Sequence, residues 1–189
     1  MPDNMTDRSA ALDLLRRHVK SENMVRHCLA SEAVMRALAR RLGEDENLWG
    51  LAGLLHDVDV ELTNADLAVH GMRAGELLRP AGYPEALIAA IAMHNEKASG
   101  KKREDRFHKA LAAGETITGL ITATTLVYPD KKLSSVKTSS VVKRMKEKQF
   151  AASVDRDIIR ECEQIGIPLP EFAELAIGAM RSIAPELGL

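Results

Sequence analysis

The chain has 189 residues, of which 46% are hydrophobic and 3% aromatic, so one domain with a core of aliphatic side chains is expected. A core of Leu, Ala, Ile, Val and Met favours helices over a β-sandwich. The 26 basic and 27 acidic residues leave a formal net charge of -1, which gives no strong case for nucleic acid or a membrane as the main partner.

Cysteine and hydropathy patterns bear on the cellular compartment. Cys28 and Cys162 show no CxxC spacing, so neither a disulfide framework nor a thiolate zinc site is expected, and a reducing cytoplasm suits them. Residues 1–7 are polar and acidic, unlike the apolar centre of a signal peptide. The longest apolar stretches contain Thr, Gly or a charge, which argues against a membrane span. We therefore expect a cytoplasmic protein.

Helical periodicity predicts three helices in the first third of the chain. Ser21 suits the N-cap of the second helix, and Gly43 suits its end. Gly50 and Gly53 lie three residues apart on the third helix. Because glycine lowers helix stability, this spacing indicates a close approach of another helix or of the functional site. The expected helices cover residues 7–19, 22–42 and 45–58.

The middle of the chain is expected to alternate helices with polar connectors. A run with one charged residue, Glu115, is apolar enough to form a helix that is buried on most sides. His27 and His94 each share a helical row with apolar positions, so both are expected to face inward. Helices are expected over residues 70–78, 85–94 and 110–128, a connector over 59–69 and a charged loop over 98–106.

The last third of the chain is also expected to be helical, with Pro168 and Pro170 marking a break. A Lys- and Ser-rich connector over 129–140 is followed by expected helices over 141–148, 155–166 and 170–183. The sequence therefore predicts an all-α protein with a single domain over residues 1–189. Residues 1–8 are expected to be a flexible N-terminus, and the helices within residues 129–189 to pack on the core.

The most informative feature is His56-Asp57, which closes the apolar run of residues 48–55. A histidine and a carboxylate at this place should be buried, and burying a charge is costly unless something pairs with it. Nitrogen and oxygen ligands of this kind suit Fe, Mn, Co, Ni or Zn. Two such ions roughly 3.5–4 Å apart can clamp a phosphoryl group and supply a nucleophile. Further His and Glu residues in apolar settings are His27, His70, His94 and Glu115.

This ordered series of a histidine, His56-Asp57, two histidines and a carboxylate resembles the HD superfamily of metal-dependent phosphohydrolases, in particular the subset with a dinuclear site. Residues 70–75 are similar to the His-x-x-x-Gly-Ala segment of bacterial HD-type diadenosine tetraphosphate hydrolases. Residues 93–95 are similar to the Tyr-His-Thr segment of the same proteins.

Two further segments support the resemblance. Residues 54–59 are close to the HDIG variant of the motif, with Val-Asp in place of Ile-Gly. Residues 128–133 and the tail that follows resemble a small bacterial group of uncharacterised predicted HD hydrolases. The similarity covers about residues 20–185.

The resemblance implies an HD-domain helical bundle that binds one or two divalent transition-metal ions. It implies that the first ion is held by His27, His56, Asp57 and Glu115, and the second by His70, His94 and a bridging Asp57. Asp57 and His56 would form the catalytic centre, where a metal-bound hydroxide attacks phosphorus. The implied substrate is a small molecule with a phosphoester or phosphoanhydride bond, expected to be a nucleotide.

One departure from the family pattern bears on activity, and two other interpretations stay open. The last ligand of the family is normally Asp, whereas Gly114-Glu115 occupies that place here. Glu is one methylene longer, so it must reposition, and the change could weaken one ion, alter metal preference or mark a lost activity. The alternatives are a di-iron HD-type oxygenase with a similar ligand series, and a degenerate HD domain that binds a nucleotide or a partner protein.

Three cations are candidates for binding substrate phosphates. Arg73 lies one helical turn from His70, Lys97 belongs to the basic loop that runs to Arg103, and Lys131 belongs to the later Lys-rich connector. The alternative for the two lysines is a solvated loop, since charge runs are usually exposed. Three further residues could contact the metal ligands or transfer protons: Asp59, Glu61 and His108. The alternative for each is an exposed, solvated side chain.

Overall fold

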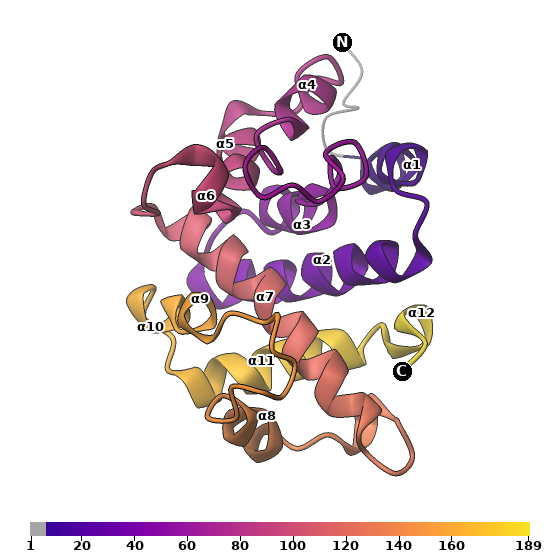
Figure 1. The fold of residues 1–189 in the computed structure, drawn as a ribbon, viewed down its shortest axis with the longest axis vertical. Coiled ribbons are helices and arrows are strands. Elements are labelled where there is room, and N and C mark those ends of the chain that lie inside the picture. Colours follow the sequence, from indigo (N-terminus) through magenta and orange to yellow (C-terminus); the bar gives the residue numbers. More distant parts are fainter. Residues whose placement is uncertain (1–6) are drawn as a thin grey trace.

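The computed structural model describes residues 7–189, and helices are the regular elements of this part of the chain (Figure 1). No strand is present among these residues, so the predicted all-α fold class is confirmed. In chain order the elements are α1 (Arg8–His18), α2 (Glu22–Leu42), α3 (Glu46–Leu55), α4 (Ala74–Leu78), α5 (Glu85–His94), α6 (Glu96–Ser99), α7 (Arg106–Leu126), η2 (Leu133–Ser135), α8 (Thr138–Arg144), α9 (Arg156–Ile159), α10 (Glu161–Gln164), α11 (Leu169–Arg181) and α12 (Ala184–Leu187).

Side-chain caps start the early helices where the sequence predicts them. Ser21 Oγ accepts a hydrogen bond from Met24 N at 3.4 Å, and Asp45 Oδ1 accepts one from Leu48 N at 2.9 Å. Gly43 ends α2 with a left-handed backbone, φ 73°, which glycine adopts at little cost. The predicted start and end of α2 are therefore confirmed.

The expected flexible N-terminus falls mostly outside the described residues, which begin at Asp7. Asp7 caps α1 by accepting a hydrogen bond from Ser9 N at 2.9 Å. Arg8 is consequently helical, contrary to the boundary expected after residue 8.

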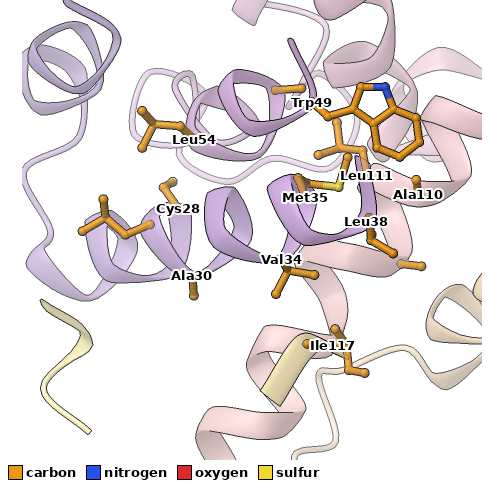
Figure 2. Close-up of a cluster of buried hydrophobic side chains, with 14 of the residues drawn as sticks. Cys28, Ala30, Val34, Met35, Leu38, Trp49, Leu54, Ala110, Leu111 and Ile117 are labelled. Atoms are coloured by element: carbon orange, nitrogen blue, oxygen red, sulfur yellow. The ribbon is translucent and has the colours of Figure 1, made fainter. Parts of the chain in front are cut away.

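Helix α3 crosses α2 at short range, as its two glycines indicate. A Cβ on Gly53 would lie 2.6 Å from the carbonyl oxygen of Ser31 on α2. A Cβ on Gly50 would lie 2.7 Å from Cγ of Arg36, also on α2. Figure 2 shows the buried cluster formed where these two helices meet α7, with Met35 of α2 labelled among its side chains. The close approach brings the end of α3 next to the middle of α2.

Helix α7 is central and contacts α2, α5, α9, α10 and α11. The predicted burial of this helix is confirmed, because its residues between Ala110 and Thr125 are mostly buried or half-buried. It begins one turn earlier than expected, since Asp105 caps it by accepting a hydrogen bond from Phe107 N at 2.7 Å. The Phe107 ring stacks on Trp49 of α3 with 5.0 Å between centroids.

Two predicted helices next to the histidines were too long. The helix expected over residues 70–78 contains only α4, because residues 70–73 form turns in which Gly71 has φ 86°. Helix α3 ends before the predicted residue 58, because Val58 N bonds to the Leu55 carbonyl at 3.0 Å in a tighter turn. Both segments therefore leave helical geometry where the candidate ligands begin.

The C-terminal part is divided into more and shorter helices than predicted. The helix expected over residues 155–166 is split into α9 and α10, and α12 was not predicted. Helix α11 contacts α2 and α7, and α12 contacts α2 (Figure 1). Among residues 7–189, no helix combines the length and the apolar character needed to cross a membrane.

Candidate metal centre

Five side chains from four parts of the chain meet in the interior of the fold. His27 comes from α2, and His94 is the last residue of α5. His56 and Asp57 follow α3 directly, and His70 stands in the turns before α4. All are buried except His27, whose side chain is 25% exposed.

Asp57 lies between two pairs of histidines. Its Oδ2 is 3.6 Å from His27 Nε2 and 3.3 Å from His56 Nε2, and these nitrogens are 3.1 Å apart. Its Oδ1 is 2.9 Å from His70 Nε2 and 3.8 Å from His94 Nε2, and these nitrogens are 3.2 Å apart. We call these groups the first triad (His27, His56, Asp57) and the second triad (Asp57, His70, His94). Within each triad the ligand atoms lie within 4.8 Å of one another.

Backbone carbonyls hold the outward-facing nitrogens of two histidines. His56 Nδ1 donates to the Gly53 carbonyl at 2.8 Å, and His94 Nδ1 donates to the Ile91 carbonyl at 2.5 Å. A carbonyl oxygen can only accept, so Nδ1 carries a proton and Nε2 is the nitrogen that faces Asp57. Hydrogen bonds of this kind orient the imidazoles of metal sites.

His27 is held in the same way by a side chain of α7. Its Nδ1 lies 3.0 Å from Thr118 Oγ1, and the Thr118 hydroxyl donates to the Glu115 carbonyl at 2.6 Å. The hydroxyl oxygen therefore accepts from the ring, which leaves Nε2 of His27 directed at the first triad.

His70 is held by a carboxylate that the sequence marked as a candidate. Asp59 is fully buried, and its Oδ1 lies 2.8 Å from His70 Nδ1. The other oxygen of Asp59 accepts the Gly71 N–H at 2.8 Å, which fixes the turn that carries His70. This carboxylate–histidine contact is a common support for a metal-binding imidazole.

Burial and neighbouring charges set the protonation of the triads. Desolvation lowers the pKa of His27 and of His94 to about 4, so both are neutral near pH 7. Burial also opposes charge on His70, but the contacts with Asp57 and Asp59 outweigh it and raise its pKa to about 10. Burial opposes charge on Asp57 as well, yet the histidines, above all His56, hold its pKa well below its usual range. Asp57 is therefore charged.

The donor set fits divalent metal ions. The charged groups paired with buried Asp57 are imidazoles, and no Lys or Arg among the described residues forms an ion pair with it. A buried carboxylate requires a compensating cation, and facing Nε2 atoms require a proton or a cation between them. Imidazole and carboxylate together suit transition ions better than Mg or Ca. The buried His and Asp groups can therefore bind metal ions.

Glu115 lies beside the first triad without joining it. Its Oε2 is 3.7 Å from His27 Nε2, and its Oε1 accepts the Thr116 hydroxyl at 2.5 Å. Burial raises the pKa of the Glu115 carboxyl to about 7. The carboxylate is thus near enough to approach an ion bound by His27, and its role as a ligand stays a prediction.

The structure places the three basic residues that were expected to bind substrate phosphates in different surroundings. Lys97 lines a hollow of about 740 Å³ that is also lined by Asp57 and Glu115. Arg73 does not line this hollow and pairs with Glu76 at 2.8 Å. Lys131 also lies outside it, in the turn after α7. Of the three, only Lys97 is placed to meet a molecule bound at the triads.

Two other candidates take no part in the site. Glu61 Oε1 accepts the backbone N–H groups of Lys20 and Ser21 at 2.7 and 2.9 Å, so it joins the connector to the start of α2. His108 lies on α7 and lines a different hollow.

Sequence reasoning placed Arg103 in a basic loop that could meet substrate phosphates, and it did not foresee the burial of this residue. The segment was expected to be an exposed charged loop, but part of it forms α6 and Arg103 is buried, with 3% of its side chain exposed. Arg103 is among the residues that line the hollow, and its guanidinium pairs with Glu161 of α10 at 2.7 Å. Nothing in the sequence distinguishes Arg103 from its exposed neighbours Lys101 and Lys102, because only tertiary contacts decide which cation is buried.

Comparison with known families agrees with this geometry. The family model of the HD domain matches residues 24–149, about two thirds of the chain. The matched segment contains both triads and Glu115 and ends before α9. No solved structure matches the chain.

Proposed function

The chain belongs to the HD domain family, a superfamily of metal-dependent hydrolases, and we propose that it hydrolyses a phosphoester or phosphoanhydride bond of a nucleotide. The observation that carries this proposal is Asp57, whose two oxygens face two separate pairs of histidine nitrogens. A carboxylate shared in this way suits a bridge between two metal ions.

The residues of the chain provide the frame for this chemistry. Two bound ions would supply Lewis acidity to a phosphoryl oxygen and lower the pKa of water. The outward hydrogen bonds of the histidines hold their rings in place, so little reorganisation is required on binding. Burial of His56, Asp57, His70 and His94 limits their contact with bulk water and would strengthen electrostatic contacts with a substrate, while His27 stays 25% exposed.

The surroundings of the triads support a substrate larger than inorganic phosphate. The hollow of about 740 Å³ opens on Asp57 and has Lys97 in its lining, together with Lys102, which pairs with Glu96 at 2.9 Å. A second hollow of about 470 Å³ shares His27 and Gly119 with it and adds Arg26. Hollows of this size are typical of small-molecule sites, and the cations suit phosphate groups, so we propose a small phosphorylated partner.

A second candidate function is a binding domain without turnover. The observation that favours it is the position of Glu115, which lies outside both triads while the family usually has a ligand there. In that case ions or a nucleotide would bind, and no bond would be cleaved.

Metal content and turnover of Asp57→Asn test the proposal. We expect about two transition ions per chain in the wild type, purified without chelator and loaded with Mn²⁺. The loaded protein should release phosphate from nucleotides or p-nitrophenol from mono- and bis(p-nitrophenyl) phosphate. Asp57→Asn removes the shared charge, so ion content should fall and turnover should drop by at least about 1000-fold.

Asp13→Asn is the matched control, because Asp13 is exposed on α1 and should leave both readouts unchanged. Bound ions without any turnover would contradict the hydrolase and favour the binding domain. Turnover that requires iron and oxygen would favour a di-iron oxygenase instead.

A further inference from the structure

Arg103 and Glu161 form an ion pair next to the second triad. Arg103 Nε and Nη2 donate to the Glu161 carboxylate at 2.9 and 2.7 Å, and the Glu161 side chain is 14% exposed. Two parallel hydrogen bonds of this kind fix the orientation of a guanidinium. Glu161 lies on α10, beyond the segment that matches the HD domain.

The remaining part of the guanidinium holds the end of α5. Arg103 Nη1 donates to the carbonyl oxygens of Met93 and His94, at 3.1 and 3.0 Å. The last carbonyls of a helix lack partners within the helix, and a cation there is favourable. Because His94 is the last residue of α5, its backbone is fixed by Arg103 while its ring faces the second triad.

The adjacent residue holds the other histidine of the same triad. Asn95 Nδ2 donates to the carbonyl oxygens of Leu67 and His70, at 2.9 and 3.0 Å. Glu96 of α6 accepts the Arg103 backbone N–H with its Oε1 at 2.7 Å, and this bond ties the loop before α7 back to α6. The loop from α5 to Arg103 therefore supports both histidines of the second triad through their backbones.

The first triad has different supports. His27 is held by Thr118 of α7, and His56 by the Gly53 carbonyl of α3. Neither contact involves Arg103 or α10. A change at Arg103 should therefore act on His94 of the second triad and leave the supports of His27 and His56 intact.

We propose that Arg103, fixed by Glu161, is a positioning residue for His94 and thereby for the ion bound at the second triad, an inference that rests on the proposed metal-dependent function. The C-terminal part of the chain, outside the family match, then contributes to the metal centre through Glu161 of α10. Arg103 itself is not a ligand, since its guanidinium cannot donate an electron pair to a metal.

Mn²⁺ binding to the purified full chain tests this inference. Three variants are titrated by calorimetry, with free Mn²⁺ followed by its electron paramagnetic resonance signal: Arg103→Met and the milder Glu161→Gln and Arg103→Lys. We expect Arg103→Met to bind one of the two ions 10- to 100-fold less tightly while the other is retained, as for other outer contacts of metal sites. Glu161→Gln and Arg103→Lys, which keep part of the hydrogen bonding, should fall between Arg103→Met and the wild type.

Arg106→Met is the matched control. Arg106 lies three residues further on and pairs with Glu44 at 3.0 Å, but this pair is more exposed. The Arg106→Met variant should therefore bind two ions with the same affinities as the wild type. Equal weakening of both ions in the Arg103 and Glu161 variants, or no weakening, would overturn the inference. So would a single ion site in the wild type. Two bound ions without hydrolysis would contradict the proposed function and leave this inference standing.

Discussion

Two acidic residues of the connector after α3 have different surroundings despite their closeness in sequence. Asp59 is fully buried and contacts His70 Nδ1 and the Gly71 N–H. Glu61 is exposed and accepts two backbone N–H groups at the start of α2. One position therefore supports a candidate ligand, and the other supports a helix junction.

Asp59→Asn should weaken metal binding, and Glu61→Gln should not. The amide at position 59 removes the negative charge that supports His70, so we expect 10- to 100-fold lower affinity for one Mn²⁺ ion in a calorimetric titration. The amide oxygen at position 61 can still accept a hydrogen bond, so stability should change by only about 0.5 kcal/mol. Unchanged Mn²⁺ affinity in Asp59→Asn would show that this carboxylate does not support the site.

The raised pKa of Glu115 predicts that the stability of the metal-free protein depends on pH. Burial raises the pKa of its carboxyl from 4.5 to about 7. The folded state thus favours the protonated form, and this contribution is full below pH 4.5 and lost as pH rises through about 7. Glu115→Gln removes the effect, so its free energy of unfolding relative to the wild type should rise over this window, by at most about 3 kcal/mol.

Denaturant unfolding in the presence of a chelator, at several pH values, measures this difference. Since other groups titrate equally in both proteins, only the difference between them reports on Glu115. A difference that stays constant between pH 4.5 and pH 8 would contradict the raised pKa.

At the scale of elements, the crossing of α3 over α2 determines where His56 and Asp57 lie. Gly53 allows this crossing, because a Cβ would lie 2.6 Å from a backbone oxygen of α2. The same residue provides the carbonyl that holds His56 Nδ1. Close helix contact and orientation of the imidazole thus depend on one short stretch of backbone.

Gly53→Ala should destabilise the protein by about 1–3 kcal/mol, because two backbones must move apart to admit the methyl group. Gly178→Ala is the matched control. Gly178 is exposed on α11 with no atom within 4 Å of the added Cβ, so this change should stabilise by about 0.5–1 kcal/mol. Urea unfolding of both variants measures the effects, and equal free energies would refute the proposed crowding at Gly53.

At the scale of the whole molecule, the core joins the early and late helices. The cluster of buried apolar side chains includes residues of α2, α3, α7 and α11, and it contains both cysteines. Cys28 lies on α2 and Cys162 on α10, and both are fully buried. Chemical labelling of either thiol therefore reports on opening of the core around it.

Both thiols should be unreactive in the native protein at pH 8. Burial raises the pKa of Cys162 to about 12 and that of Cys28 well above its usual range, so few thiolates form. We expect labelling by an aromatic disulfide only at the rate of unfolding, and two labels per chain in guanidinium. Rapid labelling of either thiol in the native protein would show that its part of the core opens locally.

The sequence by itself determined much of the helical framework and the ligand candidates. Caps at Ser21 and Asp45 and the stop at Gly43 act through bonds between near neighbours, so local reasoning found the ends that they mark. His56-Asp57 was conspicuous because charged or polar groups at the end of an apolar run need partners. The order of the other histidines led to the HD domain family, which the family model confirms.

Only the tertiary structure decided which groups meet. The turns around Gly71 depend on a bond to Asp59, twelve residues away, so the sequence predicted a helix there. Arg103 is buried because Glu161, 58 residues further on, and the carbonyls of α5 receive its donors. Local patterns carry no record of such partners, because hydrogen bonds between distant segments form only when the chain has brought them together.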